Sequence, residues 1–509
     1  MKTVFLLFDS LNRSALGAYG GDAIATPNFD RLAARSMTFD RHYTGSLPCM
    51  PARRDLHTGR LNFMHRSWGP LEAFDNSFAD CLRSKGVYSH LITDHVHYFE
   101  DGGAGFHTRF DSWEFIRGQE YDPWIAMVEP PVDAFRARFA AKHYPLDRSS
   151  KRFQHMVNRD VMVDEKDFPG PKCFSAGFDF LDRNRAADDW LLMLECFDPH
   201  EPFHAPERFR DAFPTDYEGG ALDWPYYARA TESREELDEI RANYAALVAM
   251  CDDYLGRLLD YFDRHDMWRD TALIVTTDHG FLLSEHGWWG KCRMPYYEEI
   301  SHIPMMIHDP RHQEAAGTRC SALTQTPDIM PTLLGLHGAD VPAEVRAHDL
   351  APLLSGTSQA VRDSAVFGIF GGPIGVADGC HVLYHYPDDW RAPGLKEYTL
   401  APQHMTGHFT VEELKTAKMV DGFDFTKGVP LMAIDALPDA KRVPMNDGLG
   451  FDDAETRLYD LQADPKQTAP ISDEALQDKL RQHAAATFRA HDAPTESYGW
   501  YGLDRERTV

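Results

Sequence analysis

Residues 46–60, SLPCMPARRDLHTGR, place a single cysteine directly before a segment that favours a helix. Pro51 suits the first turn of a helix, and Gly59 is a typical helix end. Cys49 would then lie at the helix N-terminus, where free backbone N–H groups and the helix dipole favour negative charge. Arg53, one turn later, would lie on the same face. The pattern favours an anion-handling role for position 49, although a buried structural cysteine explains this stretch alone equally well.

A second group of polar residues has the chemistry of a metal site. Asp278 and His279 follow the apolar segment ALIVTT, and Asp9 follows the apolar segment TVFLLF. Two carboxylates, one imidazole and an oxygen carried by position 49 form a suitable ligand set for a divalent cation. An isolated Asp-His-Gly sequence is usually only a loop turn, but together with Asp9 and Cys49 it favours the metal interpretation.

Short apolar segments separated by helical segments must position these residues. The strands predicted to be buried on both faces of a parallel sheet are 3–8, 88–93, 190–197 and 272–277. The helices predicted between and after them are 26–36, 243–265 and 326–338. Thr26 is the expected N-cap of the first of these helices. The alternation predicts an α/β fold whose large, mostly parallel sheet has helices on both faces.

Several acidic residues directly follow the carboxyl ends of these strands. They are Asp9, Asp94, Asp198 and Asp278. Open α/β sheets bind their ligands along that edge, so we expect the functional site there.

The length of 509 residues and a change of pattern after about residue 375 predict two domains. Residues 1–375 would form the α/β domain. Residues 376–509 would form a smaller α+β domain with an antiparallel sheet. The pattern there predicts antiparallel strands at 381–387 and 456–465 and a helix at 473–490.

The composition disfavours several partners and locations. Lysine and arginine together number 52 against 79 acidic residues, which gives a net charge of −27. Such a charge disfavours binding to nucleic acid or to an anionic membrane. No segment approaches the roughly 20 apolar residues of a membrane span, and the apolar part of MKTVFLLFDS is too short for a signal peptide. The eight cysteines include no C-x-x-C pair, so we expect a reducing, cytoplasmic location.

The sequence CMPAR followed by HTGR resembles the C-x-P-x-R signature of the type I, formylglycine-dependent sulfatases of the alkaline phosphatase superfamily. Four further segments match this family in order along the chain: TPNFDRLAARSMTF, DPHEPF, DHGFLLSEHGWWGK and LYDLQADP. The resemblance covers roughly residues 1–340 and returns at 457–465. It implies hydrolysis of a small-molecule sulfate monoester to an alcohol and inorganic sulfate.

The resemblance also implies roles for individual residues. A formylglycine-generating enzyme would oxidise Cys49 to formylglycine, and one hydroxyl of the hydrated aldehyde, a geminal diol, would attack sulfur. The implied ligands of one divalent metal are Asp9, Asp278, His279 and residue 49. Arg53 would hold the diol. His200 would lie near the leaving oxygen, and Lys291 would contact the sulfate and assist departure of the alcohol.

Departures from the family pattern affect the metal and the sulfate contacts. Ser10 stands where many sulfatases have a second aspartate, and His279 stands where many have asparagine. A nitrogen ligand in place of an oxygen moves the site from Ca²⁺, the usual metal of the family, toward Mn²⁺. The lysine that usually holds the sulfate is missing. Asp94, His95 and His97 occupy its neighbourhood and are the predicted substrate-binding residues, with one of the two histidines replacing the lysine.

Two other functions stay open at this point. Phosphonate monoester and phosphodiester hydrolases of the same superfamily also use formylglycine, and their substrates carry the same single charge as a sulfate monoester. A catalytically silent relative would keep the fold and bind a metal and an anion. A homo-oligomer also stays open, because the C-terminal segment TESYGWYGLDRERTV has several aromatic residues that can pack on a neighbouring subunit or on its own domain.

Overall fold

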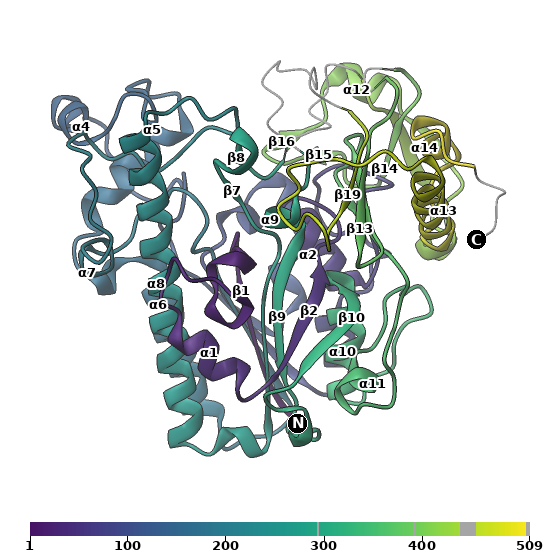
Figure 1. Ribbon diagram of the computed structural model, residues 1–509, viewed down its shortest axis with the longest axis horizontal. Coiled ribbons are helices and arrows are strands. Elements are labelled where there is room, and N and C mark those ends of the chain that lie inside the picture. Colours follow the sequence, from purple (N-terminus) through teal and green to yellow (C-terminus); the bar gives the residue numbers. More distant parts are fainter. Residues whose placement is uncertain (293–294, 390–391, 438–454, 505–509) are drawn as a thin grey trace.

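The computed structural model describes residues 1–292, 295–389, 392–437 and 455–504. Its centre is an eight-stranded sheet (Figure 1) with the strand order β10-β2-β9-β6-β1-β5-β3-β4. The strands are β1 (Lys2–Phe8), β2 (Met37–Tyr43), β3 (Tyr88–Thr93), β4 (Ser112–Phe115), β5 (Trp190–Cys196), β6 (Thr271–Thr277), β9 (His302–His308) and β10 (Arg319–Gln325). β9 is antiparallel to both of its neighbours, and the other adjacent pairs are parallel. The predicted large, mostly parallel sheet is confirmed.

β1 shows why this sheet is covered on both faces. Val4, Leu6 and Phe8 belong to one buried apolar cluster, whereas Phe5 and Leu7 belong to another. Successive side chains of a strand point to opposite faces, so an uninterrupted apolar strand requires a cover on each side.

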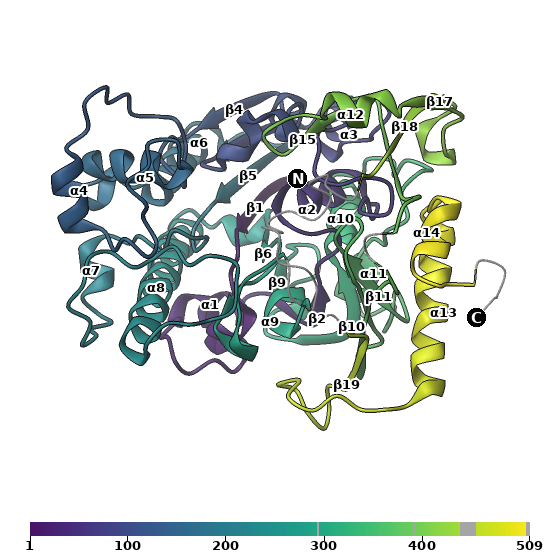
Figure 2. The same ribbon diagram turned by 90° about the horizontal axis from the view of Figure 1, so that it is seen from above.

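Helices form these two covers (Figures 1 and 2). One face is covered by α1 (Pro27–Ala33), α6 (Pro169–Asn184) and α8 (Arg234–Arg264). The other is covered by α2 (Cys49–Thr58), α3 (Phe78–Ser84), α10 (Ile329–Leu336) and α11 (Ala351–Leu354). The predicted helices at 26–36, 243–265 and 326–338 correspond to α1, to the later part of α8 and to α10. Their placement confirms the predicted three-layer α/β arrangement.

Thr26 is the N-cap residue of α1, as predicted, but its side chain makes no capping hydrogen bond. Its hydroxyl instead accepts a hydrogen bond from the backbone N–H of Gly17 at 2.8 Å. Tertiary contact with the preceding turn has replaced the local contact that the sequence favoured.

Smaller elements complete the chain. The remaining helices are α4 (Val132–Arg138), α5 (Lys151–Asn158), α7 (Glu207–Arg210), α9 (Glu298–Ser301), α12 (Val411–Lys415), α13 (Glu474–Ala490) and α14 (Thr495–Trp500). A three-stranded sheet contains β14 (Lys396–Thr399), β18 (Leu431–Asp435) and β17 (Lys418–Val420). Two short hairpins pair β7 (Leu282–Leu283) with β8 (Trp289–Gly290) and β15 (Gln403–His404) with β16 (Gly407–His408).

A four-stranded antiparallel sheet lies beside the central sheet and carries the C-terminal helices. It contains β11 (Ala365–Gly368), β12 (Ile374–Ala377), β13 (His381–His385) and β19 (Arg457–Asp460). α13 packs on it through a shared apolar cluster that includes Val376, Leu480 and Phe488. β13, β19 and α13 confirm the elements predicted in this region. The predicted domain limit at residue 375 falls within β12. β11, which precedes this limit, already belongs to the four-stranded sheet. The division into two domains stays a prediction.

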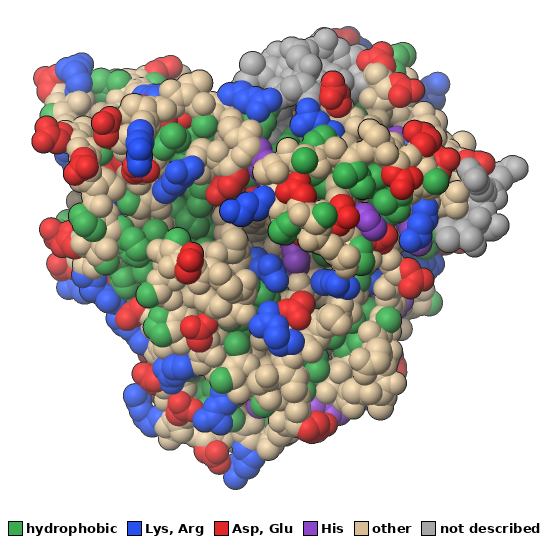
Figure 3. Space-filling view, viewed as in Figure 1, with side chains coloured by type: hydrophobic (Ala, Val, Ile, Leu, Met, Phe, Trp, Pro, Cys, Tyr) green, Lys and Arg blue, Asp and Glu red, His purple; other side chains and the backbone are tan. Residues whose placement is uncertain are grey.

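The surface of the described chain is charged and mixed. Figure 3 shows acidic and basic side chains interspersed over the face in view. Among the helices of the described residues, none has the length and apolar character needed to cross a membrane.

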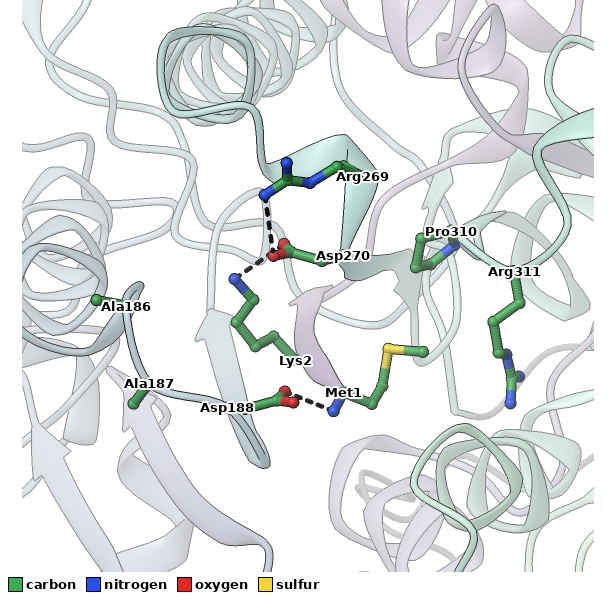
Figure 4. Close-up of a pocket in the computed structure, with 9 residues that line it drawn as sticks. All are labelled: Met1, Lys2, Ala186, Ala187, Asp188, Arg269, Asp270, Pro310 and Arg311. Atoms are coloured by element: carbon green, nitrogen blue, oxygen red, sulfur yellow. Dashed lines mark hydrogen bonds and ion pairs between the residues drawn. The ribbon is translucent and has the colours of Figure 1, made fainter.

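A cavity of about 390 Å³ lies at the amino ends of β1, β5 and β6 (Figure 4). Lys2 Nζ lies 2.9 Å from Asp270 Oδ1, and the N-terminal amine of Met1 lies 2.5 Å from Asp188 Oδ1. These cations are already paired with carboxylates. The cavity also lies at the opposite edge of the sheet from Asp9, so it is separate from the predicted site.

Candidate active site

The carboxyl ends of β1, β3, β5 and β6 lie side by side and carry most of the predicted site residues. Asp9 follows β1, Asp94 follows β3 and Asp278 follows β6. β1 pairs in register with both β5 and β6 over its whole length, so these strands end level with one another. The three aspartates are buried. This edge is therefore a polar centre built on apolar strands.

Four predicted residues converge on one point. One ligand atom from each of Asp9, Cys49, Asp278 and His279 lies within 4.8 Å of the others. His279 Nδ1 donates to the carbonyl oxygen of Gly280 at 3.1 Å, which leaves Nε2 with a free electron pair. Burial lowers the pKa of His279, so the ring is neutral. Two carboxylates and a neutral imidazole fit a divalent cation, with position 49 supplying a further ligand.

Cys49 is the first residue of α2, and this helix ends before Gly59, which has a left-handed φ of 62°. The predicted helix start and end are both confirmed. Cys49 Sγ lies 3.4 Å from His279 Nε2 and 3.6 Å from Lys291 Nζ. Burial, reinforced by Asp9, raises the pKa of the Cys49 thiol well above its usual range. The unmodified residue is therefore an uncharged thiol at neutral pH.

Arg53 lies one helical turn after Cys49, as predicted, and its guanidinium is completely buried. Nη2 lies 2.9 Å from Asp9 Oδ2 and 2.7 Å from Glu195 Oε1. Nη1 pairs with Asp278 and donates to the backbone carbonyl of Cys49 at 3.2 Å. Burial acts to lower the pKa of Arg53, but the three carboxylates raise it well above its ordinary value. A permanently charged group thus connects two of the metal-site carboxylates to the start of α2.

Lys291 brings a second buried cation to the same centre. Its Nζ donates to Ser10 Oγ at 2.9 Å and lies 3.6 Å from Asp9 Oδ1. Ser10 Oγ in turn donates to Asp9 Oδ1 at 2.8 Å. Burial would raise the pKa of Asp9, but Lys291 and Arg53 hold it well below its ordinary value. Asp9 is therefore ionised, and Ser10 links it to the lysine.

His200 lies on another side of Asp9, with its Nε2 4.0 Å from Asp9 Oδ1. His200 Nδ1 is 2.5 Å from the backbone carbonyl oxygen of Glu201 and donates its proton there. Burial and the charge of Lys291 lower the pKa of His200 well below its ordinary value. The ring is therefore neutral, and its Nε2 is available to accept a proton.

The two histidines predicted to replace the missing lysine have different surroundings. His95 Nδ1 accepts a hydrogen bond from the backbone N–H of His97 at 3.3 Å, so the proton of the neutral ring is on Nε2. This Nε2 lies 3.6 Å from Asp9 Oδ2 and has no hydrogen-bond partner among the described residues. The nitrogens of His97 lie 2.6 Å from Glu100 Oε2 and 3.3 Å from Glu120 Oε2. Burial acts to lower the pKa of His97, but these glutamates raise it to about 9. His95 therefore offers a free donor, whereas both nitrogens of His97 face carboxylates.

Asp94 lies at the same edge but has a different environment. Its Oδ1 accepts from the backbone N–H of Phe197 at 2.7 Å, and its Oδ2 accepts from Gln119 Nε2 at 3.0 Å. Gln119 also donates to Asp198 Oδ2 at 3.1 Å. Both oxygens of Asp94 are thus already hydrogen-bonded to the protein. The predicted role of Asp94 in substrate binding stays a prediction.

Two site residues, Glu195 and Glu201, were not predicted from the sequence. Glu195 is an acid within the otherwise apolar strand WLLMLEC, and a charge inside a strand buried on both faces indicates a buried partner. That partner is Arg53. Glu201 directly follows His200, and its position in DPHEPF carries no comparable signal.

Comparisons with known proteins identify the family. A family model described as Sulfatase matches residues 2–339. The multifunctional alkaline phosphatase superfamily protein PehA of Trinickia caryophylli is 27% identical over 376 residues, which cover 65% of this chain and 72% of that protein. The N-acetylglucosamine-6-O-sulfatase of Bacteroides thetaiotaomicron is 25% identical over 423 residues, which cover 71% of this chain and 72% of that protein. The chain belongs to the sulfatase family and is a sulfuric ester hydrolase.

Solved structures share the fold over nearly the whole chain. BT4656, solved in complex with its substrate D-glucosamine-2-N,6-O-disulfate, has a TM-score of 0.65 at 18% identity and covers 97% of this chain and 99% of that chain. The phosphonate monoester hydrolase of Agrobacterium radiobacter has a TM-score of 0.63 at 19% identity. This alignment covers 97% of this chain and 95% of that chain. At these identities the likeness confirms the predicted architecture.

Proposed function

We propose that the protein hydrolyses a small-molecule sulfate monoester to an alcohol and inorganic sulfate, with residue 49 as the nucleophile after its oxidation to formylglycine. The position of Cys49 carries this proposal. It begins a buried helix, lies among three side chains that could ligate a metal and is 3.6 Å from Lys291 Nζ. A hydrated aldehyde at this position would place an oxygen where the unmodified chain has a sulfur. A formylglycine-generating enzyme would carry out the oxidation.

One divalent cation fits the ligand set of Asp9, Asp278, His279 and residue 49. We propose Ca²⁺ by family habit, with Mn²⁺ as the alternative because His279 contributes a nitrogen. When bound, such an ion would polarise the sulfate ester and the hydroxyl at position 49. Arg53 contacts both carboxylates and therefore keeps them in position to bind it.

Three further side chains would handle the sulfate and the protons. The Lys291 ammonium would interact with the sulfate and give a proton to the departing alcohol oxygen. His200 Nε2, which carries no proton in the neutral ring, would accept one from a hydroxyl at position 49. His95 Nε2–H would donate to a sulfate oxygen in place of the lysine found in many relatives. The burial of these groups strengthens their interaction with a bound anion.

Sulfate is favoured over phosphonate as the substrate group. The matching family model is a sulfatase model, and a named sulfatase matches 71% of the chain. Turnover of an aryl sulfate should therefore exceed turnover of the matched aryl phosphonate monoester. A larger kcat/KM on the phosphonate would reverse this order.

Peptide mass spectrometry and one variant test the proposed nucleophile. The peptide that contains residues 49–53 should show replacement of the thiol by an aldehyde in protein matured by the native host. Cys49→Ala should fold normally but lose turnover of 4-nitrophenyl sulfate, whereas Cys81→Ala, on α3 and outside the site, should retain it. An unmodified Cys49 in active protein, or an active Cys49→Ala variant, would contradict the mechanism.

We propose a cytoplasmic location, which the cysteine usage supports. All eight cysteines lie within the described chain and are free thiols. Cell fractionation of the native host tests the location. Light scattering of the purified protein tests whether it forms a homo-oligomer.

A further inference from the structure

The buried carboxyl group of Glu201 lies beside two of the proposed catalytic side chains, His200 and Lys291. It is 1% exposed. Its Oε1 accepts a hydrogen bond from the Tyr227 hydroxyl. Its Oε2 lies 3.3 Å from His200 Nδ1 and 4.0 Å from Lys291 Nζ. This Oε2 makes no hydrogen bond within the described part of the chain.

A buried acid beside an anion-binding site needs an explanation, because it repels the substrate. Asp9 and Asp278 belong to the metal-ligand set, and Glu195 pairs with Arg53. Glu201 belongs neither to that ligand set nor to the carboxylates around Arg53, and Lys291 Nζ lies 4.0 Å from its Oε2. Burial raises the pKa of Glu201 to about 7, although Lys291 acts in the opposite direction. Keeping such a group ionised costs free energy, so its retention points to a function that involves its neighbours.

The geometry at His200 indicates that function. The backbone carbonyl oxygen and Oε2 of Glu201 lie 2.5 Å and 3.3 Å from the same ring nitrogen, Nδ1. The carbonyl oxygen accepts the Nδ1 proton and the carboxylate oxygen lies beside it at ion-pair distance, so Nε2 is left on the other side of the ring. A carboxylate at Nδ1 orients an imidazole and stabilises the positive charge that appears when Nε2 takes up a proton.

We infer that Glu201 is a positioning residue for His200: its backbone carbonyl holds the Nδ1–H tautomer, and its carboxylate, 3.3 Å from Nδ1, orients the ring and stabilises the imidazolium formed when Nε2 accepts a proton from a hydroxyl at position 49. This inference rests on the proposed function. In the step, the O–H bond of that hydroxyl breaks, an N–H bond forms at Nε2 and the proton later passes to water. The charged and titratable groups that face Glu201 are Tyr227, His200, Lys291 and Glu120.

A double-mutant cycle on the formylglycine-containing protein tests the inference with 4-nitrophenyl sulfate as the substrate. Glu201→Gln preserves the shape of the side chain and removes its charge. We expect kcat to fall roughly 10- to 100-fold with little change in KM. In a His200→Ala background, the same substitution should lower kcat by less than about twofold, because Glu201 acts through His200. Glu201→Asp should restore part of the lost activity.

Glu239→Gln is the matched control. Glu239 is also a buried glutamate, but it pairs with Arg210, with its Oε2 2.6 Å from Nη2. This control substitution and His200→Ala should act independently, so their fold losses in kcat should multiply when the two are combined. Wild-type kcat in Glu201→Gln, or losses that multiply in the double variant, would overturn the inference. Tyr227→Phe, which removes only the hydrogen bond to Oε1, should show the same non-additivity with a smaller loss, and it replaces Glu201→Gln if that variant does not fold.

Proton NMR gives a readout that does not depend on turnover. The Nδ1 proton of His200, hydrogen-bonded to the backbone carbonyl of Glu201 beside its carboxylate, should give a downfield resonance that disappears in His200→Ala and moves upfield in Glu201→Gln. A resonance that Glu201→Gln leaves unchanged would contradict the inference. If the resonance moves but the unaltered matured protein hydrolyses no sulfate ester, the proposed function fails and the contact between Glu201 and His200 stands.

Discussion

Arg53 and Asp9 form a fully buried ion pair, with Nη2 of the guanidinium 2.9 Å from Oδ2 of the carboxylate and both side chains 0% exposed. The same guanidinium also contacts Asp278 and Glu195. A single cation therefore lies among three carboxylates, two of which belong to the proposed metal-ligand set. Breaking a buried pair of this kind leaves uncompensated charge, so Arg53 is important for both stability and the arrangement of the ligands.

Arg53→Ala should lower the free energy of unfolding by about 3–5 kcal/mol, because it leaves three buried carboxylates without their cation. Arg53→Lys should fold better but should still lower kcat at least about 100-fold, because one ammonium cannot reproduce the contacts of a planar guanidinium. Urea unfolding and sulfatase assays measure the two effects. Arg136→Ala is the control, since Arg136 pairs with Asp133 at the surface and should affect activity little. Near-normal activity of Arg53→Lys would contradict this role.

Removal of the divalent cation with a chelator should abolish turnover and lower thermal stability, and Ca²⁺ or Mn²⁺ should restore both. Asp278→Asn should weaken metal binding, because it removes one anionic ligand. Metal content after dialysis and calorimetric titration measure binding independently of activity. Asp94→Asn is the matched control, because Asp94 lies at the same sheet edge but its oxygens bind Phe197 and Gln119. Equal metal binding by Asp278→Asn and the wild type would exclude Asp278 as a ligand.

The sheet and the position of Cys49 could be predicted because both depend on local patterns. An uninterrupted apolar segment such as TVFLLF indicates a strand covered on both faces, and β1 has that environment. Pro51 and Gly59 similarly indicate where α2 begins and ends. The carboxyl edge then follows from the parallel arrangement of the strands, which brings Asp9 and Asp278 together.

The partners of the charged residues could not be predicted because they come from distant segments. Glu195 meets Arg53 across a separation of 142 positions. The difference between His95 and His97 depends partly on Glu120, which lies beyond β4 and approaches His97 only in the folded chain. Sequence spacing gives no information about which histidine meets a glutamate. The charge state of each ring therefore required the tertiary structure.

Asp55→Ala should destabilise the turn that precedes α2. Asp55 Oδ1 accepts from Ser46 Oγ at 2.8 Å and from the backbone N–H of Asn62 at 2.9 Å, and its Oδ2 accepts from the backbone N–H of Ser46 at 2.6 Å. Removing the carboxylate leaves these buried donors without an acceptor, so the free energy of unfolding should fall by about 2–3 kcal/mol. Asp55→Asn, which keeps one oxygen acceptor, should lose less. A change within roughly 0.5 kcal/mol, as for a typical surface substitution, would show that the contacts are not stabilising.

His97 should make stability decrease between pH 7 and pH 9.5. Burial acts to lower the pKa of His97, but Glu100 and Glu120 raise it to about 9 in the folded protein, above the ordinary value of 6.5 for an unpaired histidine. The folded state therefore holds this proton more tightly. The resulting stabilisation is complete below about pH 6.5 and is lost as the pH rises through 9. Between pH 7 and pH 9.5, the wild type should lose about 2 kcal/mol of unfolding free energy relative to His97→Gln, measured by urea unfolding at each pH.

His143→Gln is the control. Burial and Arg152 lower the pKa of His143 to about 3, so this ring is neutral throughout the window and its substitution should leave the pH dependence of stability unchanged. If the wild type and His97→Gln have parallel pH profiles, His97 is not the charged group that the pairing with Glu100 and Glu120 requires.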